Sequence, residues 1–300
     1  MTKKAGYVTI FGKPNAGKST LINALLNYNL SIVNRKVQTT RNKILGILTE
    51  DNYQIVFIDT PGTLEPEYEL QKFMLSEIKT SLDEADVIIH IVDSAKINFE
   101  DLKKINDDYR SSFTGKKKIM VLNKIDLIEK DRLLPIMQRL SVEFDYDEIV
   151  PVSALERENV SELKALVVKY LPEGEFFYDE ETLTDKPEKF FIAEIIREKI
   201  LSFYHEEIPY SVIVDITEFK ERSDNLIYIN ADIILERESQ KIIVIGKKGI
   251  GMKRLGEKAR KDIENFLNKK VYLELFVKVR KDWRNNKAFI KDSMSRNIPS

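Results

Sequence analysis

Five short apolar runs, separated by helical patterns, mark the first half of the chain. The runs are Val8–Phe11, Ile55–Ile58, Val87–Val92, Ile119–Leu122 and Ile149–Val152. Such runs are too apolar for strands with one wet face and are typical of buried parallel strands. The pattern from Tyr7 to about Leu171 therefore predicts a doubly wound α/β domain with a mostly parallel sheet.

A different pattern begins after Leu171–Glu175, where proline and glycine interrupt the alternation. Apolar spacing then predicts, in order, a helix over Phe190–His205, strands over Tyr210–Ile216, Leu226–Leu235 and Lys241–Ile245, a helix over Lys253–Asn268, and a last strand over Val271–Val279. We therefore predict an α/β domain over residues 1–174, an exposed linker over 175–187, and an α+β domain with a basic tail over 188–300.

Composition narrows the function classes. The 300 residues contain no cysteine, which excludes disulfide frameworks and thiolate nucleophiles. No apolar run approaches the ~20 residues that span a bilayer, and the start of the chain leads straight into a strand, so we expect a cytoplasmic protein. The net charge is only −1, so any polyanion must bind to a local basic patch.

The first apolar run is followed by a complete phosphate-binding loop. Its residues are Gly12, Lys13, Pro14, Asn15, Ala16, Gly17, Lys18 and Ser19, and Thr20 continues into a helix ending near Leu26. The N–H groups of this loop and the helix N-terminus form an anion site. We expect Lys18 to contact the β- and γ-phosphates, and the Ser19 hydroxyl to bind Mg²⁺.

A second motif, Asp59, Thr60, Pro61 and Gly62, follows the next strand. Asp59 is expected to hold Mg²⁺ through a water, and the Gly62 N–H to bond the γ-phosphate, which makes Thr63–Tyr68 a conformational switch. Between the two motifs, Thr39 and Thr40 lie in a stretch without clear periodicity. We expect the hydroxyl of Thr40 to close over the Mg²⁺.

Two further motifs favour guanine. Asn123, Lys124 and Asp126 follow a buried strand, and a fixed carboxylate at Asp126 can accept hydrogen bonds from guanine N1–H and the 2-amino group. Adenine lacks both donors, so it would leave that carboxylate unpaired. We expect Lys124 to lie along the base and Asn123 to tie this loop to the phosphate loop. Ser153, Ala154 and Leu155 follow the last strand, where the Ala154 N–H can reach guanine O6.

Together these motifs resemble the translation-factor-like GTPases of the TrmE, Era and EngA group. The segment Ile245, Gly246, Lys247, Lys248, Gly249, Ile250, Lys253 and Arg254 resembles the GxxG loop of a type II KH domain. One GTPase domain followed by one KH domain is the layout of the Era family. The resemblance implies a GTP-hydrolysing ribosome-biogenesis factor that binds the 3′ end of 16S ribosomal RNA and assists assembly of the 30S subunit under control of its nucleotide state.

In the GxxG segment, the phosphate groups of RNA can approach the glycine turn, and its bases can lie beside Ile245, Ile250 and Leu255. Further cations of the last helix and the tail would extend the positive surface. They are Lys258, Arg260, Lys261, Lys278, Arg280, Lys281, Arg284 and Lys287.

The resemblance also bears on hydrolysis. The position after Gly62, where Ras-like enzymes carry a water-orienting glutamine, is Thr63. Relatives with asparagine at the place of Asn15 hold a K⁺ ion near the phosphates, which implies K⁺ activation here. The expected catalytic groups are Lys18, Thr40, Gly62 and Asn15, with Mg²⁺ as cofactor, GTP or GDP as ligand, and a monomeric chain.

Three alternatives remain open at this point. A phosphate-binding loop also serves ATP-driven enzymes, an RNA-binding module could carry a degenerate nucleotide pocket, and the basic tail could make a peripheral contact with the inner face of the membrane. His90 and His205 are expected in the core and on the surface respectively, and neither is expected to act in catalysis.

Overall fold

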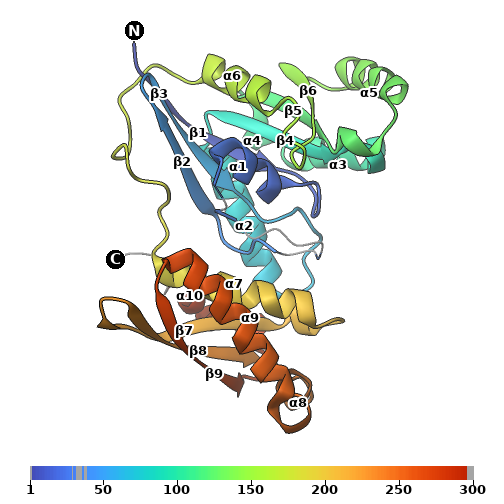
Figure 1. Cartoon of the computed structure of the whole chain (residues 1–300). Coiled ribbons are helices and arrows are strands. Elements are labelled where there is room, and N and C mark those ends of the chain that lie inside the picture. The colour runs from blue at the N-terminus through green and yellow to red at the C-terminus, as the bar shows by residue number, and fades with distance from the viewer. Residues whose placement is uncertain (1, 29, 32–35, 37–38, 296–300) are drawn as a thin grey trace. The chain divides into compact units, whose positions relative to one another are not determined.

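The computed structural model describes all residues except 1, 29, 32–35, 37–38 and 296–300. The chain divides into two compact units, drawn in Figure 1. The first contains residues 1–66 and 71–185, and the second contains residues 67–70 and 186–300. Each unit has its own sheet and its own core.

The first unit is built on a six-stranded sheet in the order β2-β3-β1-β4-β5-β6. The strands are β1 (Lys4–Phe11), β2 (Ile44–Glu50), β3 (Tyr53–Asp59), β4 (Val87–Asp93), β5 (Lys117–Asn123) and β6 (Glu148–Val152). All neighbours pair in parallel except β2 and β3, which are antiparallel. The predicted mostly parallel α/β sheet is confirmed, and the five apolar runs are five of its strands.

Helices cover both faces of this sheet. They are α1 (Lys18–Leu26), α2 (Glu69–Glu84), α3 (Phe99–Asp108), α4 (Arg110–Phe113), α5 (Lys130–Glu143) and α6 (Val160–Tyr170). Ile78 of α2 and Ile105 of α3 pack with Phe11, and Leu140 of α5 packs with Met120. Helix α1 contacts α6 and, with it, lies on the other side of the sheet (Figure 1). The motif loops leave the carboxyl ends of β1, β3, β5 and β6, where ligands of open α/β sheets bind.

The sequence analysis did not predict strand β2. Its residues Ile44, Leu45 and Ile47 are buried, and its outer edge pairs with the segment predicted to be an exposed linker. Ile47 N–H donates to Leu183 O (2.9 Å), and Leu45 N–H donates to the Asp185 carboxylate (3.0 Å). The segment therefore covers the edge of β2, whose N–H and C=O groups would otherwise be open to pairing with another chain.

The second unit is a three-stranded sheet in the order β7-β8-β9, with β8 and β9 parallel. Its elements are α7 (Glu188–Phe203), β7 (Val212–Ser223), β8 (Leu226–Leu235), α8 (Glu238–Ile245), α9 (Ile250–Leu267), β9 (Lys270–Val279) and α10 (Lys287–Ser295). Apolar residues of α7 and α9, including Ile196 and Ile263, pack on the inward positions of β7 and β8, including Val214 and Ile229. This is the α+β arrangement that the sequence predicts.

One predicted element in this unit is wrong, because Lys241–Ile245 is the end of helix α8 and not a strand. The Gln240 side chain accepts from the N–H groups of Glu236 and Arg237, which fixes the helix start. Only Val244 of the apolar run is fully buried, while Ile242 and Ile243 are exposed. A short apolar run does not distinguish a strand from one helical turn with exposed apolar residues.

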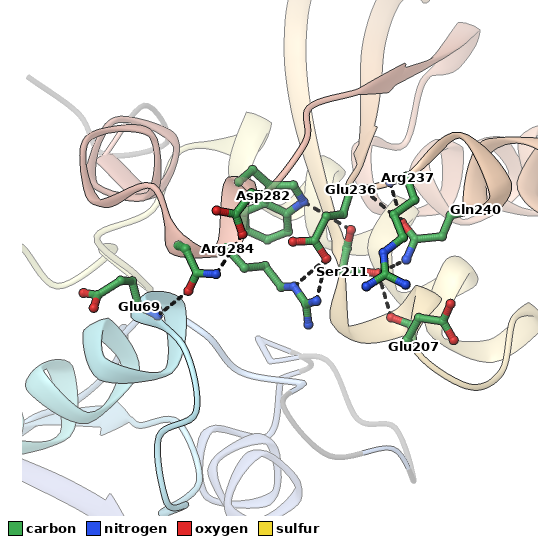
Figure 2. A network of polar contacts seen from close by, with 10 residues as sticks. Glu69, Glu207, Ser211, Glu236, Arg237, Gln240, Asp282 and Arg284 are labelled. Carbon is green, nitrogen blue, oxygen red and sulfur yellow. Dashed lines mark hydrogen bonds and ion pairs between the residues drawn. The ribbon is translucent and has the colours of Figure 1, made fainter.

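The segment after β9 is fastened to the second unit by a buried network, drawn in Figure 2. Trp283 is fully buried and donates from Nε1 to Ser211 O (3.3 Å). The Arg284 guanidinium donates to Glu236 Oε2 from two nitrogens (2.9 and 2.5 Å), and Gln240 donates to the Ser211 hydroxyl (2.9 Å). The tail cation Arg284 thus has a structural role, which the sequence analysis did not foresee.

Candidate functional site

The phosphate-binding loop joins β1 to α1, and two of its glycines have conformations that other residues rarely adopt. Gly12 has φ 155° and Gly17 has φ 103°. A Cβ on Gly12 would lie 2.2 Å from Ile91 O, and one on Gly17 would lie 2.1 Å from Asn123 Nδ2. Any side chain at either position would therefore collide with β4 or with the Asn123 loop. The remaining loop residues from Lys13 to Ala16 complete the turn, and Thr20 lies in α1.

The lysine of this loop is buried against its own backbone. Lys18 Nζ donates to Gly12 O and Lys13 O, both at 3.0 Å, and the residue is only 7% exposed. Burial lowers the pKa of Lys18 to about 8, and the charge of Asp59 opposes that shift. A phosphate in the loop would add negative charge and favour the protonated lysine.

Three oxygen-bearing side chains meet beside the loop, as expected for a Mg²⁺ site. Ser19 Oγ lies 2.9 Å from Asp59 Oδ2 and 3.2 Å from Thr40 Oγ1, and Thr40 Oγ1 lies 3.3 Å from Asp59 Oδ2. Asp59 is fully buried, and its Oδ1 has no hydrogen-bond partner among the described residues. Burial raises the pKa of Asp59, while the charge of Lys18 and nearby hydroxyls, including those of Ser19 and Thr40, oppose the rise. A buried carboxylate oxygen and two hydroxyls are a donor set that fits Mg²⁺ and its waters.

The Asp59–Gly62 segment is pressed against the phosphate-binding loop. Thr60 Oγ1 donates to Ile10 O (2.8 Å), and Thr63 N–H donates to Gly12 O (3.2 Å). A Cβ on Gly62 would lie 2.7 Å from the Pro14 ring. The backbone around Gly62 and Pro61 therefore lies so close to the loop that a side chain at position 62 would collide with Pro14.

The threonine expected to bind Mg²⁺ lies on the same side of the pocket. The predicted stretch includes Val37 and Gln38, which lie outside the described residues. Thr40 is buried and adjoins Asp59, whereas Thr39 is more exposed. The structure thus places the hydroxyl of Thr40, the residue favoured by the sequence analysis, beside Ser19.

The guanine-reading motifs form a second cluster. Asn123 Nδ2 donates to Ala16 O (2.8 Å), which ties this loop to the phosphate-binding loop as expected. Ser153 Oγ donates to Asp126 Oδ1 (2.5 Å) and thereby holds the carboxylate. The Ala154 N–H, expected to reach guanine O6, donates to Asn123 Oδ1 (3.0 Å) instead, and the Leu155 side chain is exposed.

The GxxG segment connects α8 and α9 in the second unit. Gly246 and Gly249 have φ 70° and 76°, and Lys248 between them has φ 51°. Lys247 and Lys248 are both exposed, and Gly249 N–H donates to Gly246 O (3.1 Å). The turn therefore presents two ammonium groups and open backbone next to the N-terminus of α9, an arrangement that suits phosphate.

The apolar part of this surface differs from the prediction in one residue. Ile250 is exposed and Ile245 partly so, but Leu255 is fully buried in the core and cannot contact a base. Ile242 and Ile243, missed because α8 was assigned as a strand, are exposed on the preceding helix. They enlarge the apolar surface beside the glycine turn.

The predicted positive surface is also smaller than expected. Lys253 is exposed, and the Arg254 guanidinium lies over the Phe203 ring, 4.7 Å from its centroid. In the tail, Lys278 pairs with Asp232 (2.5 Å) and Arg284 with Glu236. Lys287 pairs with Glu69 (3.5 Å). Ion pairing therefore offsets three of the five tail cations considered for RNA or membrane contact. None of the described helices is long and apolar enough to cross a membrane.

The two histidines lie where the sequence analysis expected them. His90 is buried beside Phe11 and its Nδ1 lies 2.7 Å from the Tyr146 hydroxyl, while His205 is exposed. Burial lowers the pKa of His90 to about 3, so its ring is neutral near pH 7.

Comparison with known proteins assigns the two units. The family described as 50S ribosome-binding GTPase matches residues 7–124, and the family described as KH domain matches residues 207–284. The GTPase Era of Clostridium kluyveri is 42% identical over 296 residues, covering 96% of this chain and 98% of the relative.

Two solved structures of Era cover the same extent. A variant of Aquifex aeolicus Era bound to GDP and aluminium fluoride superposes with a TM-score of 0.90, at 41% identity over 96% of this chain and 98% of that one. Era in complex with MgGDPNP and nucleotides 1506–1542 of 16S ribosomal RNA gives a TM-score of 0.89 at the same identity and coverage. Because relatives at 41–42% identity match nearly the whole chain, across both the GTPase and the KH unit, the protein belongs to the Era family of GTPases.

Proposed function

We propose that this chain hydrolyses GTP with Mg²⁺ bound by Ser19, Thr40 and a water on Asp59, and that its nucleotide state controls binding of the 3′ end of 16S ribosomal RNA by the KH domain during assembly of the 30S subunit. The observation that best supports this proposal is the arrangement of side chains around the phosphate-binding loop. Asn123 binds that loop directly and belongs to the motif that contains Asp126, while the Ser19–Thr40–Asp59 cluster lies beside Lys18. A guanine nucleotide with its metal fits both sets of groups.

The small subunit is the better-supported assembly target. The family description that names the 50S particle covers only residues 7–124, which belong to the GTPase domain. The relative solved with a 16S RNA fragment covers 96% of this chain, including the KH domain. Because the KH domain carries the candidate RNA surface, the comparison that includes it has more weight.

We expect the Lys247→Asp/Lys248→Asp double variant to bind RNA about 10- to 100-fold more weakly than the parent, because two phosphate-attracting charges are reversed at an open turn. The measurement is fluorescence anisotropy with RNA corresponding to nucleotides 1506–1542, in GDP and in a non-hydrolysable GTP analogue. The parent should bind more tightly in the analogue. A Lys189→Asp/Lys220→Asp variant, which reverses two exposed lysines elsewhere in the second unit, serves as the matched control.

Either of two results would count against this assignment. Equal loss of affinity in the control variant would mean that net charge and not the GxxG turn determines binding. Equal affinity in GDP and in the analogue would remove the proposed control by nucleotide state.

The same proposal assigns a monovalent cation to the phosphate-binding loop. Asn15 has φ 62° in this loop, and Thr63 supplies no carboxamide to orient water. We propose that K⁺ near Asn15 supplies positive charge to the transition state. Turnover at saturating GTP should be about tenfold faster in K⁺ than in Na⁺ at equal ionic strength, and Asn15→Ala should abolish the difference. Identical rates in the two salts for the parent would contradict this role.

A further inference from the structure

An ion pair joins the end of strand β4 to the guanine-reading loop. Lys124 Nζ donates to Asp93 Oδ2 (2.7 Å) and also to Asn15 O (2.7 Å). The side chains of Asp93 and Lys124 are 15% and 29% exposed, so the pair is partly shielded from water. A single ammonium group thus connects β4, the phosphate-binding loop and the base-reading motif.

Lys124, which carries this ammonium, and Asn15, which accepts a hydrogen bond from it, both have left-handed backbone conformations. Lys124 has φ 65° and Asn15 has φ 62°. Residues other than glycine adopt this conformation at a cost, and it persists where surrounding contacts fix it. The bonds from Lys124 Nζ to Asp93 and to Asn15 are contacts of this kind.

Asp93 is itself held firmly. It lies opposite Asn123 in the β4–β5 register, and its Oδ1 accepts from Ala95 N–H (3.1 Å). The next residue, Ser94, is buried and donates from its hydroxyl to Asn123 O (2.7 Å). Asp93 and Ser94 therefore bind two consecutive residues of the base-reading loop from a strand end in the sheet core.

From this geometry we propose that Asp93 is a positioning residue for guanine-nucleotide binding, which acts by holding Lys124 across the phosphate-binding loop. The inference rests on the proposed binding of GTP and GDP in this pocket. Without Asp93 the ammonium keeps one of its two partners, and the long lysine side chain gains freedom that it must lose again when a base binds along it. Nucleotide affinity therefore falls, while the groups that act on the γ-phosphate keep their places.

A double-mutant cycle separates this role from a general structural one. The variants are Asp93→Ala, Lys124→Ala and the combination, and the measurement is the Kd for a fluorescent GDP analogue. We expect Asp93→Ala to weaken binding about 30-fold. A partly shielded ion pair lies between exposed and buried ion pairs in interaction energy, and each 1.4 kcal/mol corresponds to a tenfold change in Kd. The combined variant should bind no more weakly than Lys124→Ala alone, because Asp93 acts through Lys124.

Steady-state kinetics of the same variants provide the second readout. For Asp93→Ala we expect KM for GTP to rise by about the same factor, with kcat within about threefold of the parent. The melting temperature of the nucleotide-free protein should stay near that of the parent, whereas a merely structural residue would lower both it and kcat. Asp101→Ala is the matched control, since it removes another acid that pairs with a cation of the phosphate-binding loop, Lys13.

The outcomes distinguish the inference from the function on which it rests. If the parent binds neither GDP nor GTP, the proposed function fails. If the parent binds and the two single losses multiply in the combined variant, only the positioning role is overturned. A loss in Asp101→Ala as large as that in Asp93→Ala would overturn it as well, because any ion pair at the loop would then suffice.

Discussion

Replacing Lys18 by alanine should reduce GTP turnover by about 10²- to 10³-fold, the size typical of losing one strong donor to the transferring group. Lys18 is buried, and its ammonium bonds two carbonyls of the phosphate-binding loop. When the transition state forms, the same ammonium can neutralise charge on the γ-phosphate oxygens. Single-turnover hydrolysis at saturating GTP measures the effect on chemistry apart from binding.

The control for this variant tests whether folding explains the loss. Removing a charged group beside the buried Asp59 could alter stability, so Lys18→Met, which keeps an unbranched apolar side chain, should be measured as well. Lys117→Ala removes a lysine of β5 that forms an exposed ion pair with Asp147, and it should leave turnover unchanged. If Lys18→Ala and Lys18→Met fold like the parent and keep more than about a tenth of its rate, the assigned role of Lys18 is wrong.

The sequence analysis predicted which side chains come together at the phosphate-binding loop, because its motifs are local. Gly12 and Gly17 lie in the loop between β1 and α1, and Lys18 and Ser19 open α1, so their chemistry follows from spacing alone. The spatial meeting of Ser19, Thr40 and Asp59 also follows, because strands of a parallel sheet end at one edge. What spacing could not show is that the Ala154 N–H bonds Asn123, since that bond depends on the relative height of two loops.

The mistakes arise where tertiary contacts decide the structure. Helix α8 has a run of apolar residues that fits a strand equally well, and its helical state depends on Gln240 reaching back to two backbone N–H groups. The segment 175–187 is polar enough to be exposed, yet the edge of β2 offers it backbone partners. Asp93 gave no signal, because an aspartate at the end of a strand is common. Its role depends on the ion pair with Lys124, which is 31 residues away in the sequence.

Replacing Asp126 by asparagine should reverse the base preference of the pocket from guanine to xanthine. Ser153 Oγ donates to Asp126 Oδ1 at 2.5 Å, so an asparagine can keep that bond with its carbonyl oxygen and direct its amide N–H₂ toward the base. Guanine presents a 2-amino donor to that position and would meet a second donor, whereas xanthine presents a carbonyl oxygen. Because a buried donor or acceptor without a partner is costly, we expect GTP affinity to fall by about 10³-fold and XTP to take its place.

Competition of GTP, XTP and ATP against a fluorescent nucleotide measures this reversal, and hydrolysis of saturating XTP completes the test. The phosphate and Mg²⁺ groups are untouched by the substitution, so kcat with XTP should approach that of the parent with GTP. Asp131→Asn, an equivalent change at an exposed position in α5, should leave the guanine preference intact. If Asp126→Asn still prefers GTP, or if ATP competes with GTP for the parent at similar concentration, the carboxylate of Asp126 does not read the base, and the assignment of guanine specificity to this loop is wrong.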